Sequence, residues 1–160
     1  MVRVYLGLGS NVDREKHIRS GLLALQSQFG ELLVSPIYES EAVGFEGDHF
    51  LNLVVGLDTD VSVAELHAVI KCIEDDHGRE RGGPKFSPRT LDIDILTYGD
   101  EVGLVDEVML PRDEIVKNAF VLLPLSEIAP DECHPQLDVP YKTLWESYDK
   151  ASQVLWRFQF

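Results

Sequence analysis

Alternation of apolar and polar residues predicts four strands in the first hundred residues. The segment RTLDIDIL, residues 89–96, shows the pattern most clearly, because leucine and isoleucine separate and flank Asp92 and Asp94. A period of two places both aspartates on one face of a strand. Pro36 lies inside another such run and indicates an edge strand or a bulge there. The other predicted strands cover residues 2–8, 31–40 and 50–58.

Apolar residues at helical spacing predict two long helices. The first covers residues 14–29 and ends at Gly30, a residue type common just after a helix. The second has a clear start signal, because Ser62 followed three residues later by Glu65 is the pattern of a capping box. Gly78 is expected to close this second helix.

The order of these elements predicts the fold class. Strand, helix, two strands, helix and strand form the βαββαβ core of an α+β ferredoxin-like fold, an antiparallel sheet with helices packed on it. No repeat or linker is visible, so we expect one domain spanning residues 1–160. After the core, the pattern predicts a hairpin over 101–110, a short helix over 111–120, a packed turn over 122–130, a final helix over 141–149 and a terminal strand over 154–160.

Composition narrows the classes of partner. The chain has 160 residues and a formal net charge of −14, so repulsion opposes binding to nucleic-acid phosphates. No apolar run approaches the ~20 residues that span a bilayer, and the N-terminus lacks the apolar run of a signal peptide. Cys72 and Cys133 are far apart in the sequence, and we expect both to be reduced thiols that bind no metal. We therefore expect a cytoplasmic protein that binds neither nucleic acid nor membranes.

A basic segment stands directly before the aspartate strand in this acidic chain. It carries Arg79, Arg81, Lys85 and Arg89 against a single acid. The two aspartates could face water, pair with these arginines, or bind a hard divalent cation. Carboxylates for Mg²⁺ beside Arg and Lys for phosphate are the usual layout of a metal–nucleotide site. Because the GxxxxGK[ST] motif is absent, Arg and Lys side chains would have to hold the phosphates.

Several motifs together resemble those of the 6-hydroxymethyl-7,8-dihydropterin pyrophosphokinases of folate biosynthesis. They are LGSN, SPIYES, FLNLVV, IEDDHGRER, PRTLDIDIL and AFVLLPLSEIAPD, and they span most of the chain. The PRTLDIDIL element is specific, and its coincidence with the other motifs argues against chance similarity. The resemblance implies an enzyme that transfers the pyrophosphoryl group of MgATP to the hydroxymethyl oxygen of the pterin and releases AMP.

The resemblance also implies roles on the nucleotide side of the site. Asp92 and Asp94 match aspartates that bridge two Mg²⁺ ions, which would neutralise charge on the phosphates. Arg79 and Arg89 match arginines that engage phosphates and stabilise the transition state. The remaining expected nucleotide contacts are Glu74, Arg81, Lys85, Ile95 and Arg112.

On the pterin side, the resemblance implies a flat pocket with polar edges. Ser40 and Val43 match positions whose backbone groups hydrogen-bond the ring. Asn52 matches an asparagine whose amide reads the edge of the ring, and a polar side chain inside an apolar strand needs a partner. Phe50 and Phe120 match aromatic residues that sandwich the bicycle, although ordinary core packing would be the first explanation without the resemblance.

Three departures from the family pattern leave alternatives open. Arg112 stands where histidine is common, Phe86 replaces a larger aromatic residue, and Phe50 often is tyrosine in the family. There are two alternative interpretations. The protein could be a transferase of the same fold with another heterocyclic alcohol as acceptor, or a non-catalytic nucleotide-binding module. ATP and a reduced pterin are the expected small-molecule partners, and a monomer or weak homodimer is the expected assembly.

Overall fold

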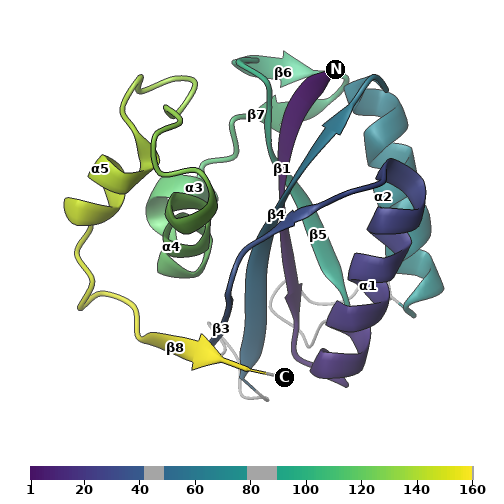
Figure 1. Cartoon of the computed structure of the whole chain (residues 1–160), viewed down its shortest axis with the longest axis horizontal. Helices are drawn as coiled ribbons and strands as arrows, with labels where there is room; N and C mark the ends of the chain where they lie inside the picture. The colour runs from purple at the N-terminus through teal and green to yellow at the C-terminus, as the bar shows by residue number, and fades with distance from the viewer. Residues whose placement is uncertain (42–48, 79–89, 160) are drawn as a thin grey trace.

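The centre of the molecule is an antiparallel sheet, seen in a computed structural model that describes residues 1–41, 49–78 and 90–159 (Figure 1). Its strands follow the order β5-β1-β4-β3-β8, and β2 also pairs with β4. The antiparallel pairing of β5, β1, β4 and β3 confirms the expected ferredoxin-like core. The strands are β1 Val2–Ser10, β2 Leu33–Val34, β3 Ile37–Ser40, β4 Phe50–Thr59, β5 Asp92–Tyr98 and β8 Leu155–Phe158.

Helices cover both faces of this sheet (Figure 1). The two predicted helices, α1 (Arg14–Phe29) and α2 (Val63–Asp76), lie together on one face. The opposite face carries α3 (Glu114–Lys117), α4 (Ala119–Ile128) and α5 (Tyr141–Glu146). Within the described ranges, no helix has the length and apolar character needed to cross a bilayer.

Side-chain alternation assigns the strand residues to two apolar clusters. Leu6 of β1 belongs to the cluster under α1 and α2, whereas its neighbour Tyr5 belongs to the cluster under α4 and α5. Along β5, Ile93 and Ile95 join the first cluster and Leu96 joins the second. Because successive side chains of a strand point to opposite faces, the two aspartates of β5 lie on the α4 face.

The predicted strand over residues 31–40 is divided into β2 and β3 around Pro36. Proline has no backbone N–H, so it interrupts the hydrogen-bond ladder. The backbone of Ser35 donates to the Val54 carbonyl at 2.9 Å, and the Ser35 hydroxyl accepts from the Val54 N–H, also at 2.9 Å. The interruption indicated by Pro36 is therefore confirmed, and a serine side chain satisfies the opposing strand.

The irregular C-terminal third also follows most of the prediction. The hairpin forms as β6 (Gly103–Val105) and β7 (Val108–Leu110). The short helix and the final helix appear as α3 and α5, both shorter than predicted. The terminal strand is β8, which pairs with β3 and extends the sheet.

The packed turn predicted over 122–130 is wrong, because most of this segment belongs to the helix α4. Pro124 suggested a turn, since proline removes one intrahelical hydrogen bond. The helix forms nevertheless because it is apolar on most sides and buried: Val121, Leu122 and Leu125 are 8% exposed or less. Burial against β4 and α5 outweighs the local preference.

The capping box at the start of α2 generates a stability prediction. The Ser62 hydroxyl accepts from the Glu65 N–H at 3.2 Å, and a Glu65 carboxylate oxygen accepts from the Ser62 N–H at 3.3 Å. We expect Ser62→Ala to lower the free energy of unfolding by about 1 kcal/mol in urea denaturation. Thr143→Ala, an exposed substitution in α5, is the control. Equal losses in both variants would contradict a capping role.

Candidate active site

Two carboxylates open the edge strand β5 on the α4 face of the sheet. Asp92 is paired with Gly9 of β1, and Asp94 is paired with Gly7. Because cross-strand partners share a face, each carboxylate has a glycine as its neighbour on β1. The space beside both aspartates is therefore free of β1 side chains.

Gly9 lies between this carboxylate pair and a polar residue of the next strand. Its other cross-strand partner is Asn52 of β4, which in turn pairs with Tyr38 of β3. A Cβ atom added to Gly9 would lie 2.6 Å from Asn52 Oδ1, closer than real contacts allow. The amide of Asn52 thus occupies the space that a side chain at position 9 would need.

The same face and the same end of the sheet carry the predicted pterin contacts. Ser40 at the end of β3 pairs with Phe50 at the start of β4, two residues before Asn52. Ser40 is buried, and Phe50 and Asn52 are partly buried. Phe120 of α4 packs against the cluster on this face. The structure therefore brings four of the five predicted pterin residues to the face of the aspartates.

Arg112 lies beside the carboxylate pair. Its Nη2 atom is 3.5 Å from Asp94 Oδ1, and its Nε atom is 2.8 Å from Glu114 Oε2. The backbone N–H of Arg112 donates to the Leu96 carbonyl at 2.9 Å, which fixes this segment against β5. The residue that departs from the family pattern is thus a neighbour of Asp94.

The electrostatic balance around Asp94 disfavours its charge. Burial, followed by the charge of Asp92, raises the pKa of Asp94 to about 7, while Arg112 opposes the shift and Glu114 adds to it. One guanidinium therefore does not neutralise the acidic groups around it. A further cation at this position would stabilise the ionised form.

The donor set fits Mg²⁺ that arrives with a phosphate ligand. Among the residues that the structure describes, no group of three or more His, Cys, Asp or Glu side chains is placed to hold a metal ion. Mg²⁺ often uses only one or two carboxylates, with water and phosphate oxygens completing its shell. Asp92 and Asp94, two residues apart on a paired strand, provide such a carboxylate pair.

Two predicted nucleotide contacts lie behind the sheet. Ile95 is 4% exposed in the cluster under α1 and α2. Glu74 of α2 is 2% exposed, and its Oε2 accepts from the Ile93 N–H at 2.9 Å. The Glu74 carboxylate thus satisfies a backbone donor of the edge strand and joins α2 to β5. The structure does not bring these two side chains to the face of Asp92 and Asp94.

Several predicted site residues lie outside the part of the chain that the structure describes. This applies to one predicted pterin contact, to the lid aromatic residue and to the whole basic segment. They are Val43, Arg79, Arg81, Lys85, Phe86 and Arg89.

The sequence interpretation missed three features of the site. Gly9 determines the space between Asp92 and Asn52, and the glycines at alternate positions in LGLGS were the available signal. Glu114 forms an ion pair with the Arg112 guanidinium, and no sequence pattern indicated this contact. The Ser10 hydroxyl donates to the Thr90 carbonyl at 2.5 Å and so attaches the start of the aspartate strand to β1.

Comparison with known proteins gives a consistent result. The family model described as 7,8-dihydro-6-hydroxymethylpterin-pyrophosphokinase matches residues 5–130. A 2-amino-4-hydroxy-6-hydroxymethyldihydropteridine pyrophosphokinase of Aquifex aeolicus is 40% identical over 144 residues, covering 89% of each chain. The Porphyromonas gingivalis protein of the same name is 37% identical over 146 residues, covering 88% of this chain and 99% of the relative.

Solved structures support the fold. The HPPK-DHPS protein of Plasmodium falciparum, solved with pterin and p-hydroxybenzoate, superimposes with a TM-score of 0.72 at 17% identity. The match covers 94% of this chain and 43% of that longer chain. At this identity the likeness concerns the fold alone.

The fold, the carboxylate pair and these relatives define an ATP-dependent transferase of diphosphate groups. The chain belongs to the 7,8-dihydro-6-hydroxymethylpterin-pyrophosphokinase family, which acts in folate synthesis, and the resemblance seen in its motifs is confirmed.

The raised pKa of Asp94 predicts how stability depends on pH. Between the ordinary value of 3.8 and about 7, the folded protein keeps a proton that the unfolded chain loses. The free energy of unfolding should therefore fall as the pH rises through this window. Asp94→Asn cannot ionise, so it should lose this part of the slope and be more stable than the parent protein at pH 8. Urea unfolding in EDTA between pH 4.5 and 8 measures both effects, because this pH range covers the raised pKa of Asp94.

The matched control is Asp100→Asn, an exposed substitution in the turn after β5. It should leave the slope unchanged. A parent-like slope in Asp94→Asn would show that the Asp94 carboxylate is not destabilised in the folded protein.

Proposed function

We propose that this chain transfers the pyrophosphoryl group of MgATP to the hydroxymethyl oxygen of 6-hydroxymethyl-7,8-dihydropterin. In this reaction the acceptor hydroxyl releases its proton to solvent and its oxygen forms a bond to the β-phosphorus, while the bond between that phosphorus and the α,β-bridging oxygen breaks and AMP leaves with that oxygen. One observation carries the proposal: Asp92 and Asp94 share a face and an end of the sheet with Asn52, Phe50 and Ser40. The carboxylates that would hold the metal ions and phosphates thus lie on the same face as aromatic and amide groups that suit a flat ring with polar edges.

The pterin would lie over the start of β4. Phe50 and Phe120 would supply apolar faces for the bicycle, and the Asn52 amide would pair with its polar edge. Backbone groups at Ser40 and Val43 would bind the remaining ring donors and acceptors. Gly9 permits this arrangement because it leaves the Asn52 amide in place.

Asp92 and Asp94 would hold two Mg²⁺ ions together with the triphosphate. When bound, these ions would neutralise phosphate charge and lower the pKa of the acceptor hydroxyl. Arg112 would orient Asp94 through their 3.5 Å ion pair and reach towards a phosphate. Catalysis would then rest mainly on alignment and charge neutralisation.

The remaining nucleotide contacts come from the basic segment before β5 and from two buried residues, Ile95 and Glu74. Arg79, Arg81, Lys85 and Arg89 are proposed from the family motif, as groups that engage the phosphates. Ile95 would border the adenine through its backbone on β5, since its side chain is buried behind the sheet. Glu74 would act on the nucleotide indirectly, by holding the Ile93 N–H.

The setting of the enzyme is also part of the proposal. We propose a cytoplasmic protein of one domain that works as a monomer or weak homodimer on small molecules. The net charge of −14 supports the exclusion of nucleic acid as a partner.

The direct test is to mix the protein with MgATP and 6-hydroxymethyl-7,8-dihydropterin and to measure AMP and the pterin diphosphate. Both products should form in equal amounts, and EDTA should stop their formation. AMP release with another heterocyclic alcohol, and none with the pterin, would favour the alternative acceptor. The absence of AMP with all acceptors would favour a binding module.

Removing one carboxylate should abolish this activity. We expect Asp94→Ala to lower kcat by more than about a hundredfold, because the metal ions lose a ligand where charge develops. Asp58→Ala, at the far end of β4, is the matched control and should retain most of the activity. A near-parental kcat in Asp94→Ala, with a folded protein by circular dichroism, would exclude the proposed metal role.

Filling the space at Gly9 should affect the pterin more than the nucleotide. We expect Gly9→Ala to raise the KM for the pterin by about tenfold or more, because the Asn52 amide must move, an effect equivalent to a lost buried hydrogen bond. Steady-state kinetics with each substrate varied in turn measure this. Asn52→Ala in the Gly9→Ala background should add little further, as in a double-mutant cycle between coupled residues. Additive effects would show that Gly9 acts independently of Asn52.

A further inference from the structure

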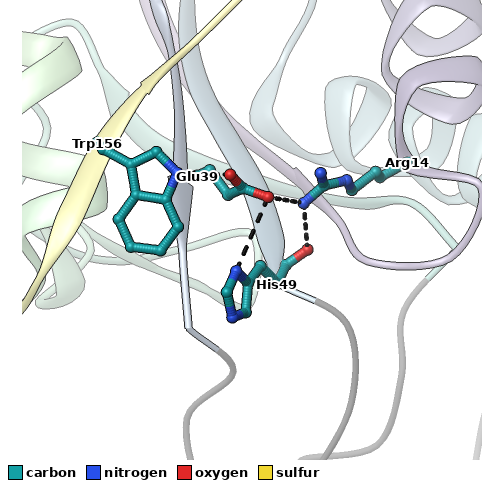
Figure 2. A network of polar contacts seen from close by, with 4 residues as sticks. All are labelled: Arg14, Glu39, His49 and Trp156. Atoms are coloured by element: carbon teal, nitrogen blue, oxygen red, sulfur yellow. Dashed lines mark hydrogen bonds and ion pairs between the residues drawn. The ribbon is translucent and has the colours of Figure 1, made fainter.

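A polar network joins four segments of the chain near the end of the sheet that carries the aspartates: the start of α1, β3, the residue before β4, and β8. Figure 2 shows its members, Arg14, Glu39, His49 and Trp156, which we call the Glu39 network. Glu39 Oε2 accepts from Arg14 Nη1 at the start of α1, and Glu39 Oε1 accepts from Trp156 Nε1 on β8. One carboxylate therefore holds the first turn of α1 and the C-terminal strand at once.

The fourth member, His49, enters the network through both its backbone and its ring. Its carbonyl accepts from Arg14 Nη1 at 3.0 Å, and its Nδ1 atom is 3.8 Å from Glu39 Oε2. The His49 ring also meets the Trp156 ring edge to face, with centroids 5.4 Å apart. His49 is thus fixed by contacts to both Arg14 and Trp156.

The network lies directly behind two proposed pterin residues. Glu39 precedes Ser40 in β3, and His49 precedes Phe50 in β4. Ser40 and Phe50 face the substrate side as cross-strand partners. The Glu39 side chain points to the opposite face, because successive strand residues alternate. The network therefore contacts the backbone neighbours of the site without reaching the substrate.

Partial burial gives these contacts more weight than ordinary surface pairs. The side chains of Arg14 and Glu39 are only 25% and 15% exposed. Charge-assisted hydrogen bonds that are shielded from water are stronger than exposed ion pairs. The Arg14 guanidinium also lies 5.1 Å from the Phe158 ring centroid, a second contact between α1 and β8.

Strand β8 is held on its other face as well. Arg157 Nη2 donates to Glu127 Oε2 of α4 at 3.0 Å, and the Tyr38 hydroxyl donates to Glu127 Oε1. Contacts on both faces therefore fix β8 beside β3. The match to the family model ends at residue 130, so it assigns no role to this strand.

We propose that Trp156, acting through Glu39 and His49, is a positioning residue that holds Ser40 and Phe50 in the arrangement that binds the pterin. The C-terminal strand then determines affinity for the acceptor while the nucleotide side of the site is independent of it. This inference rests on the proposed function for the identity of the acceptor.

Trp156→Phe tests the inference with little risk to folding, since Trp156 is 39% exposed. The substitution removes the indole N–H and keeps an aromatic ring. We expect the KM for the pterin to rise about three- to tenfold, the effect of one hydrogen bond of ordinary strength, because the lost bond acts on the pterin only through Ser40 and Phe50; kcat and the KM for ATP should stay within about twofold of the parent protein. Glu39→Gln, which weakens both the Arg14 and the Trp156 bonds, should shift the same constant in the same direction.

The matched control is Trp145→Phe in α5, which removes an indole N–H outside the network and should leave all three constants unchanged. An unchanged pterin KM in both network variants would overturn the inference. So would parallel changes in kcat, both KM values and the melting temperature, because these would indicate general destabilisation.

Hydrogen exchange of the free protein separates this inference from the proposed function. The amides of Phe50 and Leu51 should exchange faster in Trp156→Phe than in the parent protein and in Trp145→Phe. If the parent protein releases no AMP, the proposed function fails, and the exchange rates alone decide the positioning role. Equal exchange in the three proteins would overturn it.

Discussion

The pairing of β1 between β4 and β5 is the constraint on which the candidate site depends. One face of β1 carries the apolar residues Leu6 and Leu8, which pack under α1 and α2. The other face carries Gly7 and Gly9 at the end where the aspartates and Asn52 lie. The period of two thus lets a single strand supply core packing on one side and open space on the other.

Much of the fold could be predicted because the local signals agree with the packing. The alternation around Asp92 and the capping box at Ser62 both correspond to observed elements. The helix α4 could not be predicted in this way, because Pro124 gives a turn signal and the helix depends on burial between layers that are distant in sequence. A local pattern carries no information about such burial.

The sequence predicted which residues belong to the candidate site, but only part of how they are arranged in space. Sequence placed Asp92 and Asp94 on one face, and strand register then brings Asn52 to the same row. The alternation that places Asp94 on one face places the Ile95 side chain on the other, so its position could have been predicted. The position of Glu74 depends instead on how α2 packs against β5, which no local pattern indicates. The ion pairs of Arg112 likewise depend on how the segment after β7 folds back on β5.

The attachment of β8 has a practical consequence for handling the protein. The start of β1 and the end of β8 lie at opposite ends of the molecule (Figure 1). The N-terminus is at the end of β1 remote from the aspartates, whereas Phe158 lies against Arg14 at the start of α1. An affinity tag or fusion partner joined after residue 160 would be attached next to a strand that pairs with β3, beside the proposed acceptor residue Ser40. The same addition before residue 1 would leave that strand undisturbed.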